Sequence, residues 1–254
     1  MTVSAAGNAE LSLRRVALVA GFGLLAMAVL APIAHFGILE TLVEPGNAAA
    51  TVSNIRGSEG LFRAAIAAFL VVTFLDILMA WALYVLLRPV NATLAMLVGW
   101  LRLAAAAAFL PALANLFDVA QLLGGAAGST VPAATVETQV MGSLASFNNG
   151  WDLMLAVFGL HLIGLGILVY RSVQFPRFLG VLVVIAGIGY LADTFARILV
   201  ADFSFTFSIF TFVGEALLIV WFLWRGIRGF VAEPDDGDDR VPGTTGAQPT
   251  PVMP

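Results

Sequence analysis

Two charged residues of opposite sign, Asp76 and Arg102, lie in successive apolar segments at similar distances from the short connection between them. They fall about 12 residues before and about 14 residues after Arg88, which opens that connection, so two antiparallel helices would hold them at equal depth. A charge in the middle of a membrane costs roughly 2.5 to 3.5 kcal/mol on insertion scales, and it needs a partner or a water-lined pocket. The two residues predict either an ion pair that fixes the helix register, or a site in which Arg102 binds an anionic head group or substrate and Asp76 holds it in place.

Three further ionisable side chains inside apolar segments are candidates for acid–base chemistry: His161, Asp193 and Glu215. His161 and Glu215 lie near mid-depth, where a histidine facing a carboxyl group acts as a general base or proton relay, with a hydrogen-bonded packing role for His161 as the alternative. Asp152 precedes His161 by nine residues, and two and a half helical turns make the two face opposite ways. Asp193 and Arg197 share one helix face, which predicts an intrahelical ion pair or a proton-handling role for Asp193.

The residue types that are missing narrow the chemistry. The chain has no cysteine, which excludes disulfides and cysteine nucleophiles, and all 12 basic residues are arginine, which excludes lysine Schiff bases. His35, His161, Asp193 and Glu215 do not follow a ligand spacing such as HExxH, so neither a metal nor a cofactor is predicted. The net charge of −4 comes largely from the acidic run at residues 235–239, and nucleic acid is not an expected partner.

The elements that position these residues are apolar segments long enough to cross a membrane. Of the 254 residues, 60% are hydrophobic and 11% charged, and the mean hydropathy is +0.98, far from soluble averages. About 20 apolar residues cross the hydrocarbon core as a helix. The sequence predicts an all-α integral membrane protein, a bundle of six transmembrane helices: Val16–Leu39, Leu61–Leu87, Ala92–Phe117, Gly150–Tyr170, Phe178–Leu199 and Phe207–Trp224.

Arginine placement predicts the orientation of the bundle. The arginines at helix ends on the side of the N-terminus are Arg14, Arg15, Arg88, Arg171, Arg177, Arg225 and Arg228. The opposite connections contain Arg56, with Arg63 and Arg197 just inside helix ends. Because cytoplasmic loops carry the excess of basic residues, both termini are expected in the cytoplasm. The Ala- and Gly-rich, lysine-free composition indicates a bacterial protein, and we expect a multi-pass protein of the cytoplasmic (inner) membrane.

Three regions follow from this topology. Residues 1–15 are expected to form a cytoplasmic N-terminus, and residues 16–229 the transmembrane domain. Residues 230–254 are rich in Pro, Gly, Thr and Asp, which is typical of a disordered acidic tail.

The outer side of the predicted bundle carries two long connections, residues 40–60 and 118–149. In the second, between helices three and four, Val136, Val140 and Leu144 recur at helical spacing and predict a short interfacial helix. The remaining intramembrane ionisable residues lie toward this side: His35, Arg63, Asp152, Asp193 and Arg197. Any internal polar cavity is therefore expected to open outward.

Several stretches together resemble a known family. They are NIRGSEGLFR at 54–63, LDILMAWALYVLLRPV at 75–90, Arg102 in WLRLAAA, NNGWDLMLAVFGLHLIGLGILVYRS at 148–172 and FLGVLVVIAGIGYLAD at 178–193. The chain is similar here to the bacterial membrane family catalogued as domain of unknown function 4386, over roughly Leu11 to Gly229. The resemblance implies a multi-span bacterial membrane protein, and it supplies no catalytic residues to carry over.

Three classes of function fit these observations. The first is a non-catalytic structural, sensory or assembly protein whose charges specify helix packing. The second is a small-solute or proton-coupled permease in which the four mid-depth ionisable residues line a pathway. The third is a membrane-embedded enzyme that acts on a lipid or isoprenoid from the outer side, with His161, Asp193 or Glu215 as acid and base. Membrane lipids are expected partners in all three, while a homo-oligomer and the identity of a small-molecule ligand stay open.

Overall fold

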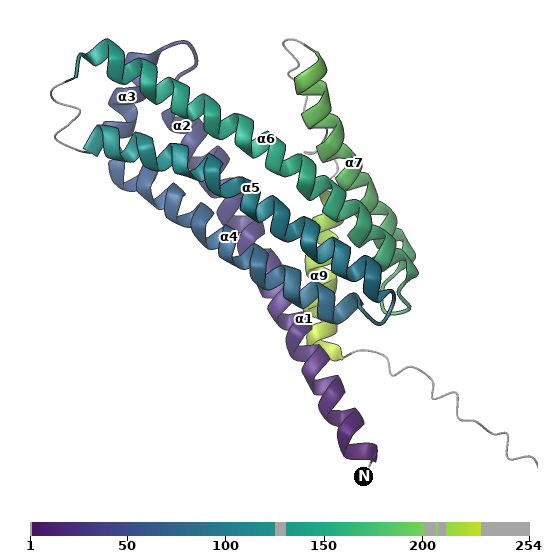
Figure 1. Cartoon of the computed structure of the whole chain (residues 1–254). Helices are drawn as coiled ribbons and strands as arrows, with labels where there is room; N and C mark the ends of the chain where they lie inside the picture. The colour runs from purple at the N-terminus through teal and green to yellow at the C-terminus, as the bar shows by residue number, and fades with distance from the viewer. Residues whose placement is uncertain (1, 125–130, 201–206, 208–211, 230–254) are drawn as a thin grey trace, which may run out of the picture.

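The chain forms a bundle of long helices (Figure 1). The computed structural model describes residues 2–124, 131–200, 207 and 212–229, and side chains from residue 13 onward. The helical elements are α1 (Thr2–Pro32), η1 (Ile33–Leu39), α2 (Glu40–Leu42), α3 (Ala48–Gly57), α4 (Glu59–Leu87), α5 (Ala92–Gly124), α6 (Ala133–Arg171), α7 (Arg177–Leu199) and α9 (Val213–Arg228). The described residues contain no strand. The predicted tail, residues 230–254, lies outside the described residues.

Five helices are long and apolar enough to cross a membrane: Leu13–Leu42, Glu59–Leu87, Ala92–Gly124, Ala133–Arg171 and Arg177–Leu199. The prediction of six spans is therefore wrong for the described part of the chain. The sixth predicted span corresponds to α9, which has 16 residues, and residues 208–211 lie outside the described residues. At a rise of 1.5 Å per residue α9 extends about 24 Å, which is less than the hydrocarbon thickness of about 30 Å.

The lateral surface of the bundle is apolar as well as its interior. Large hydrophobic side chains are more than half exposed on several helices, including Phe22 (61%), Phe74 (59%), Trp100 (60%) and Ile188 (54%). A contiguous apolar surface of this kind is not stable in water. The exposed side chains therefore identify the lateral surface as one that faces lipid.

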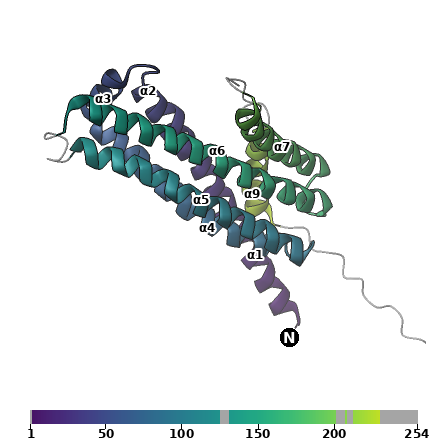
Figure 2. The same cartoon turned by 45° about the horizontal axis from the view of Figure 1, so that its top comes forward.

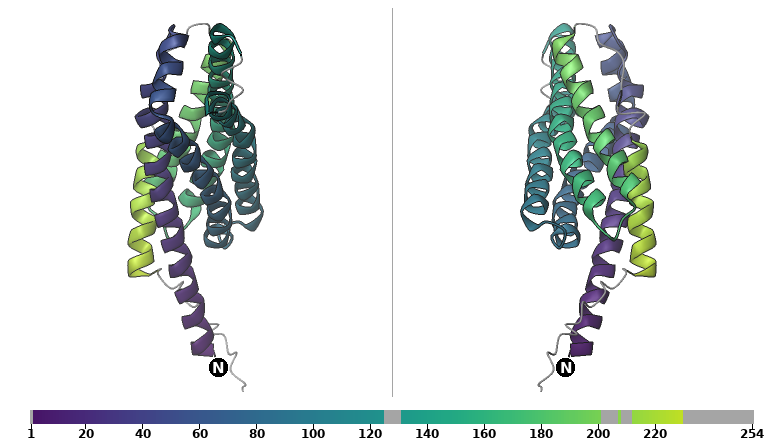
Figure 3. Two further views of the ribbon diagram at one scale, coloured as in Figure 1. Left: turned by 90° about the vertical axis from the view of Figure 1, so that its left-hand side faces the viewer. Right: turned by 90° about the vertical axis from the view of Figure 1, so that its right-hand side faces the viewer.

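The helix ends that carry most arginines meet at one end of the bundle, which we call the arginine end. Figure 1 shows the start of α1, the α4–α5 turn, the α6–α7 turn and the end of α9 at this end, and α2 and α3 at the opposite end. Figure 3 shows α9 lying along α1.

The segments expected to form long loops at the opposite end are mostly helical. α5 continues to Gly124, and α6 is a single helix of 39 residues from Ala133. The predicted short interfacial helix is thus the first part of α6 and not a separate element. Val136, Val140 and Leu144 are buried, with exposures of 2%, 0% and 5%, in the apolar core where α6 packs against α3 and α5.

Two apolar cores hold the bundle together. The core near the arginine end draws on α1, α4, α5, α6, α7 and α9 and includes Met79 and Phe222. The core at the opposite end draws on η1 and α2 to α6 and includes Phe69 and Phe147, and no described residue of α7 or α9 belongs to it. α7 consequently joins the other helices near the arginine end, and Figures 1 and 2 show its other end standing apart from α2 and α3.

The helices α6 and α7 approach each other to backbone contact. A Cβ atom added at Gly187 would lie 2.5 Å from the carbonyl oxygen of Gly159, and one at Gly180 would lie 2.6 Å from that of Gly166. Small residues at a helix interface permit this approach in membranes.

A π-helical segment, η1, interrupts the first span directly after Pro32. Its wider turn is seen at Glu40, whose backbone N–H donates to the carbonyl of His35 five residues earlier. Single π-turns inside α-helices frequently mark functional sites. Here the π-turn carries His35, which lies on the inner side of the bundle.

Candidate functional site

Arg102 is the centre of a buried polar network that joins four helices. Its side chain is 1% exposed, and its guanidinium forms an ion pair with Asp76 Oδ1 of α4 at 2.8 Å. It also contacts His161 Nε2 of α6 at 3.1 Å and donates to Met27 Sδ of α1 at 3.6 Å. The predicted pairing of Asp76 with Arg102 is confirmed. We call Asp76, Arg102 and His161 the buried network.

Both ring nitrogens of His161 are engaged. Nδ1 lies 2.9 Å from the carbonyl oxygen of Val98, and because a carbonyl can only accept, Nδ1 must carry the hydrogen. Arg102 can only donate, so Nε2 accepts its N–H. These partners assign the neutral Nδ1–H tautomer, and neither nitrogen is left to take a proton from a substrate.

Glu215 forms its hydrogen bond with Tyr190 and not with His161. Its Oε1 accepts a hydrogen bond from the Tyr190 hydroxyl at 3.0 Å. The Phe158 ring stacks on the His161 ring with centroids 5.4 Å apart, and it contacts the Tyr190 ring edge-on at 5.9 Å. Among the described residues no hydrogen bond joins His161 directly to Glu215, and the relay between them stays a prediction.

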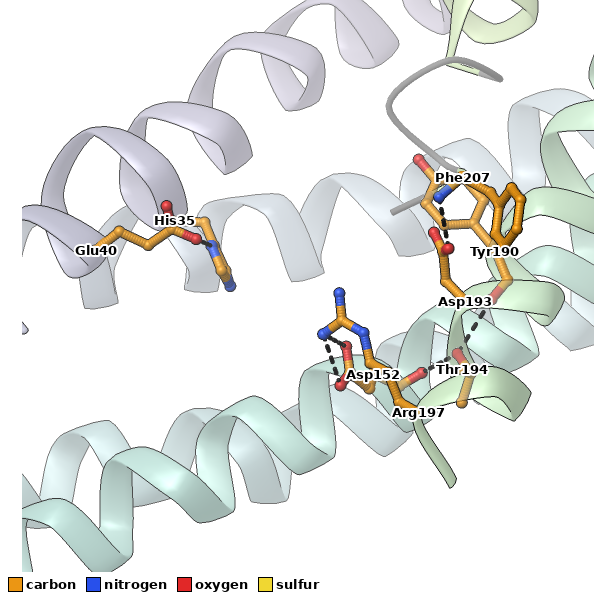
Figure 4. Close-up of polar contacts among 8 residues, drawn as sticks. All are labelled: His35, Glu40, Asp152, Tyr190, Asp193, Thr194, Arg197 and Phe207. Atoms are coloured by element: carbon orange, nitrogen blue, oxygen red, sulfur yellow. Dashed lines mark hydrogen bonds and ion pairs between the residues drawn. The ribbon is translucent and has the colours of Figure 1, made fainter. Parts of the chain in front are cut away.

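Asp152 and Arg197 form an ion pair between α6 and α7. Arg197 NH1 lies 3.0 Å from each carboxylate oxygen of Asp152, and the Thr194 hydroxyl donates to the Asp152 carbonyl at 2.9 Å. The intrahelical pair predicted for Asp193 and Arg197 is therefore wrong. Asp193 is buried, and its Oδ1 accepts from the backbone N–H of Phe207 at 2.6 Å (Figure 4).

His35 lies in an aromatic environment and has unused bonding capacity. Its side chain is 13% exposed, and its ring centroid lies 4.8 Å from that of Phe36 and 4.7 Å from that of Trp151. Its Nδ1 is buried without a hydrogen-bond partner, at 3.6 Å from Glu40 Oε1. That distance is too long for a hydrogen bond, so the contact with Glu40 is a long ionic one.

Residues of η1, α2, α6 and α7 together form a second polar group, which we call the polar cluster: His35, Glu40, Asp152, Asp193 and Arg197. Figure 4 shows the His35–Glu40 pair on η1 and α2 and the Asp152–Arg197 pair on α6 and α7, with no dashed contact between the two pairs. All five lie in the part of the bundle away from the arginine end, where α7 contributes no described residue to the apolar core.

The candidate catalytic residues are not brought together. His161 is held by Arg102 and Val98, Asp193 accepts from a backbone N–H, and Glu215 accepts from Tyr190. Among the described residues no hydrogen bond joins any two of the three candidates.

The sequence reasoning missed the aromatic partners of the polar residues. Trp151, Phe158 and Tyr190 were not singled out, because aromatic residues are common throughout the apolar segments. The π-turn that directs His35 inward has no recognised sequence signal, although Pro32 just before it marks a break in helix bonding.

Long apolar helices, an apolar lateral surface and ionisable residues held in interior pairs define a multi-pass α-helical membrane protein. The chain belongs to the family described as "Domain of unknown function (DUF4386)", whose model matches residues 19–226. It is also similar to a protein of Archaeoglobus fulgidus described as "Uncharacterized protein", with 34% identity over 158 residues that cover 62% of this chain and 80% of the relative. No solved structure matches the chain significantly.

Proposed function

We propose that the protein binds a small zwitterionic solute, one with a carboxylate and an ammonium group, at the polar cluster. We further propose that the solute enters from the outer side of a bacterial cytoplasmic membrane, with both chain ends in the cytoplasm. The support for this orientation is the gathering of arginines at one end of the bundle, because basic residues are retained on the cytoplasmic side. The polar cluster lies toward the other end.

The carboxylate of the solute would bind Arg197. The side chain of Arg197 is 42% exposed, and its described bonds to Asp152 use NH1 alone. A guanidinium has five N–H donors in a planar fork suited to a carboxylate. Arg197 can therefore keep Asp152 as a partner and bind a second carboxylate with the other edge of the fork.

The ammonium group would bind near Glu40. The Glu40 carboxylate is 58% exposed, and its nearest ionic contact is the long one to His35. The Phe36 and Trp151 rings that surround His35 offer faces that attract a cation. The observation that carries the proposal is this pair of opposite charges, each with unused bonding capacity, on two sides of an aromatic-lined histidine (Figure 4).

The test is a binding measurement on the purified full-length protein in nanodiscs. Leucine is compared with isoamylamine, which lacks its carboxylate, and with isocaproate, which lacks its amine. We expect leucine to bind more tightly than either analogue. Arg197→Gln and Glu40→Gln should each weaken leucine binding by about 10- to 100-fold, because each removes one charge-assisted hydrogen-bonded contact of about 1.5 to 3 kcal/mol.

Glu44→Gln is the matched control, because Glu44 is also an exposed glutamate, four residues after Glu40, and lies outside the polar cluster. It should leave binding unchanged. Equal affinity for leucine and its two analogues, or equal losses in Glu40→Gln and Glu44→Gln, would refute the proposal.

Proton-coupled transport of the same solute is the second candidate function. It is favoured by Glu215, which forms no ion pair with a described residue and is linked through Tyr190 to α7, the helix that carries Asp193 and Arg197 of the polar cluster. If the protein is a carrier, reconstituted vesicles should take up leucine under an inward proton gradient. Glu215→Gln should then abolish the gradient dependence while leaving leucine binding intact.

We infer that the buried network has a structural role and does not bind the ligand. Arg102 is 1% exposed, and its partners come from three other helices. A head group or substrate would have to displace these partners before it reached the guanidinium. This favours helix packing over the alternative of head-group binding by Asp76 and Arg102.

A further inference from the structure

The C-terminal part of α9 carries two tryptophans and two arginines stacked on one another at the arginine end. The guanidinium carbon of Arg225 lies 5.2 Å from the ring centroids of both Trp221 and Trp224, and that of Arg228 lies 5.2 Å from Trp224. Trp221 Nε1 donates to the carbonyl of Gln174 at 3.2 Å, which anchors the indole to the α6–α7 connection. We call Trp221, Trp224, Arg225 and Arg228 the α9 cluster.

The positive charge of the α9 cluster is not neutralised by any described carboxylate, because each ion pair among the described residues lies elsewhere. Arg225 NH1 makes a long contact of 3.5 Å to the Gly229 carbonyl, and its Nε is buried without a hydrogen-bond partner. Arg14 NH2 donates to the Ile227 carbonyl at 2.7 Å. A third cation is thereby held next to the cluster.

We propose that the α9 cluster binds the phosphate of an anionic phospholipid in the leaflet at the arginine end. Tryptophan rings lie preferentially at the level of the lipid head groups, so the cluster is placed at the depth of the phosphates. The guanidinium fork matches phosphate geometry and can bind it through two N–H donors. Stacking on two indoles holds Arg225 in position, which lowers the entropy lost on binding.

This inference does not depend on the solute proposed for the polar cluster, which lies in the other half of the bundle. The competing occupant is the acidic run Asp235, Asp236, Asp238 and Asp239, which follows α9 in the sequence. The anionic lipid is favoured because its phosphate lies beside Trp221 and Trp224 in any membrane that contains it, whereas the carboxylates are strongly hydrated and belong to a polar segment.

The test is lipid retention by the full-length protein, released from nanodiscs of equal parts phosphatidylglycerol and phosphatidylcholine and weighed by native mass spectrometry. We expect the wild type to retain phosphatidylglycerol selectively. Each arginine near an anionic surface contributes a factor of about five in affinity, so the double variant Arg225→Gln with Arg228→Gln should weaken phosphatidylglycerol binding about 25-fold. Arg225→Lys keeps the charge without the planar fork and should also weaken it.

Arg88→Gln is the matched control, since Arg88 is exposed at the same end and has no described tryptophan contact. It should weaken retention clearly less than Arg225→Gln does, because no described tryptophan contact holds its guanidinium in place. If Arg88→Gln weakens retention as much as Arg225→Gln, the attraction is diffuse and the proposal fails. If phosphatidylglycerol is retained only after the four tail aspartates are changed to asparagine, the tail is the occupant and the proposal also fails. Size-exclusion chromatography of each variant verifies that it remains folded.

Discussion

The ion pair at the centre of the buried network can be tested by a double-mutant cycle. Asp76→Leu and Arg102→Met each remove one partner of a contact of 2.8 Å between side chains that are 16% and 1% exposed. Each single change leaves an unpaired charge in the bundle interior. The double variant leaves no charge there, although His161 Nε2 loses the N–H that it accepts from Arg102.

The magnitudes follow from this difference. Breaking a buried pair by removing one partner costs about 3 to 5 kcal/mol, whereas replacing both partners by apolar residues is often close to neutral. The acceptor left free on His161 adds a penalty of about 1 to 3 kcal/mol to the double variant. The sum of the two single effects should therefore exceed the double effect by at least about 3 kcal/mol.

The assay is unfolding of the purified protein by sodium dodecyl sulfate in mixed micelles, followed by circular dichroism. The matched control is the i,i+4 pair of Glu59 and Arg63, which also has a 2.8 Å contact but is 47% and 52% exposed. Its cycle, with glutamine at both positions, should give a coupling of about 0.3 to 0.5 kcal/mol. A coupling between Asp76 and Arg102 as small as that of the control would show that the buried network does not hold the helices together.

Three further predictions concern the fold. Gly187→Ala should lower the free energy of unfolding by about 1 to 3 kcal/mol, because the new Cβ would lie 2.5 Å from a backbone oxygen of α6. Gly142→Ala is its control: a Cβ there would have no atom within 4 Å, so this change should be neutral or stabilising in the same assay. In the cysteine-free chain, a single cysteine at Val173, which is 81% exposed, should react with a membrane-impermeant maleimide from the cytoplasmic side. A single cysteine at Arg56 should react from the outer side. Labelling of both positions from one side would contradict the topology. His161→Phe should destabilise the protein by about 2 to 4 kcal/mol through the loss of two buried hydrogen bonds, and an unchanged unfolding midpoint would refute the assigned tautomer and its partners.

The pairing of Asp76 with Arg102 was predictable because it depends on local geometry. A short turn forces two helices to run antiparallel side by side, so residues equally far from the turn meet. The prediction of a long outer loop at residues 118–149 was less accurate, because the structure there depends on contacts between helices and not on local geometry. Hydropathy reports whether a segment enters lipid, but helix formation there depends on packing of Val136, Val140 and Leu144 against neighbouring helices.

The partner of Arg197 could not be predicted from spacing. Asp193 is near Arg197 in the sequence, but a long arginine side chain can also reach carboxylates on a neighbouring helix. The close approach of α6 to α7 brings Asp152 to 3.0 Å from Arg197. His161 and Glu215 were predicted to lie at similar depth, yet their hydrogen bonds go to different partners, His161 to Arg102 and Val98 and Glu215 to Tyr190. Depth is one coordinate of a residue, and the rotation of each helix about its axis is another that hydropathy does not contain.

By itself, then, the sequence determined that the chain must cross a membrane repeatedly, that arginines gather at one end, and that Arg102, His161 and Asp193 enter the interior. These features depend on composition along the chain, because apolar length must be buried and the backbone hydrogen-bonded within each segment. Tertiary structure alone decided which of those polar residues touch, since contacts between helices distant in sequence follow from packing of both surfaces at once. It also decided that His35 turns inward with an unused nitrogen, since the π-turn rotates that part of the first span relative to a regular α-helix.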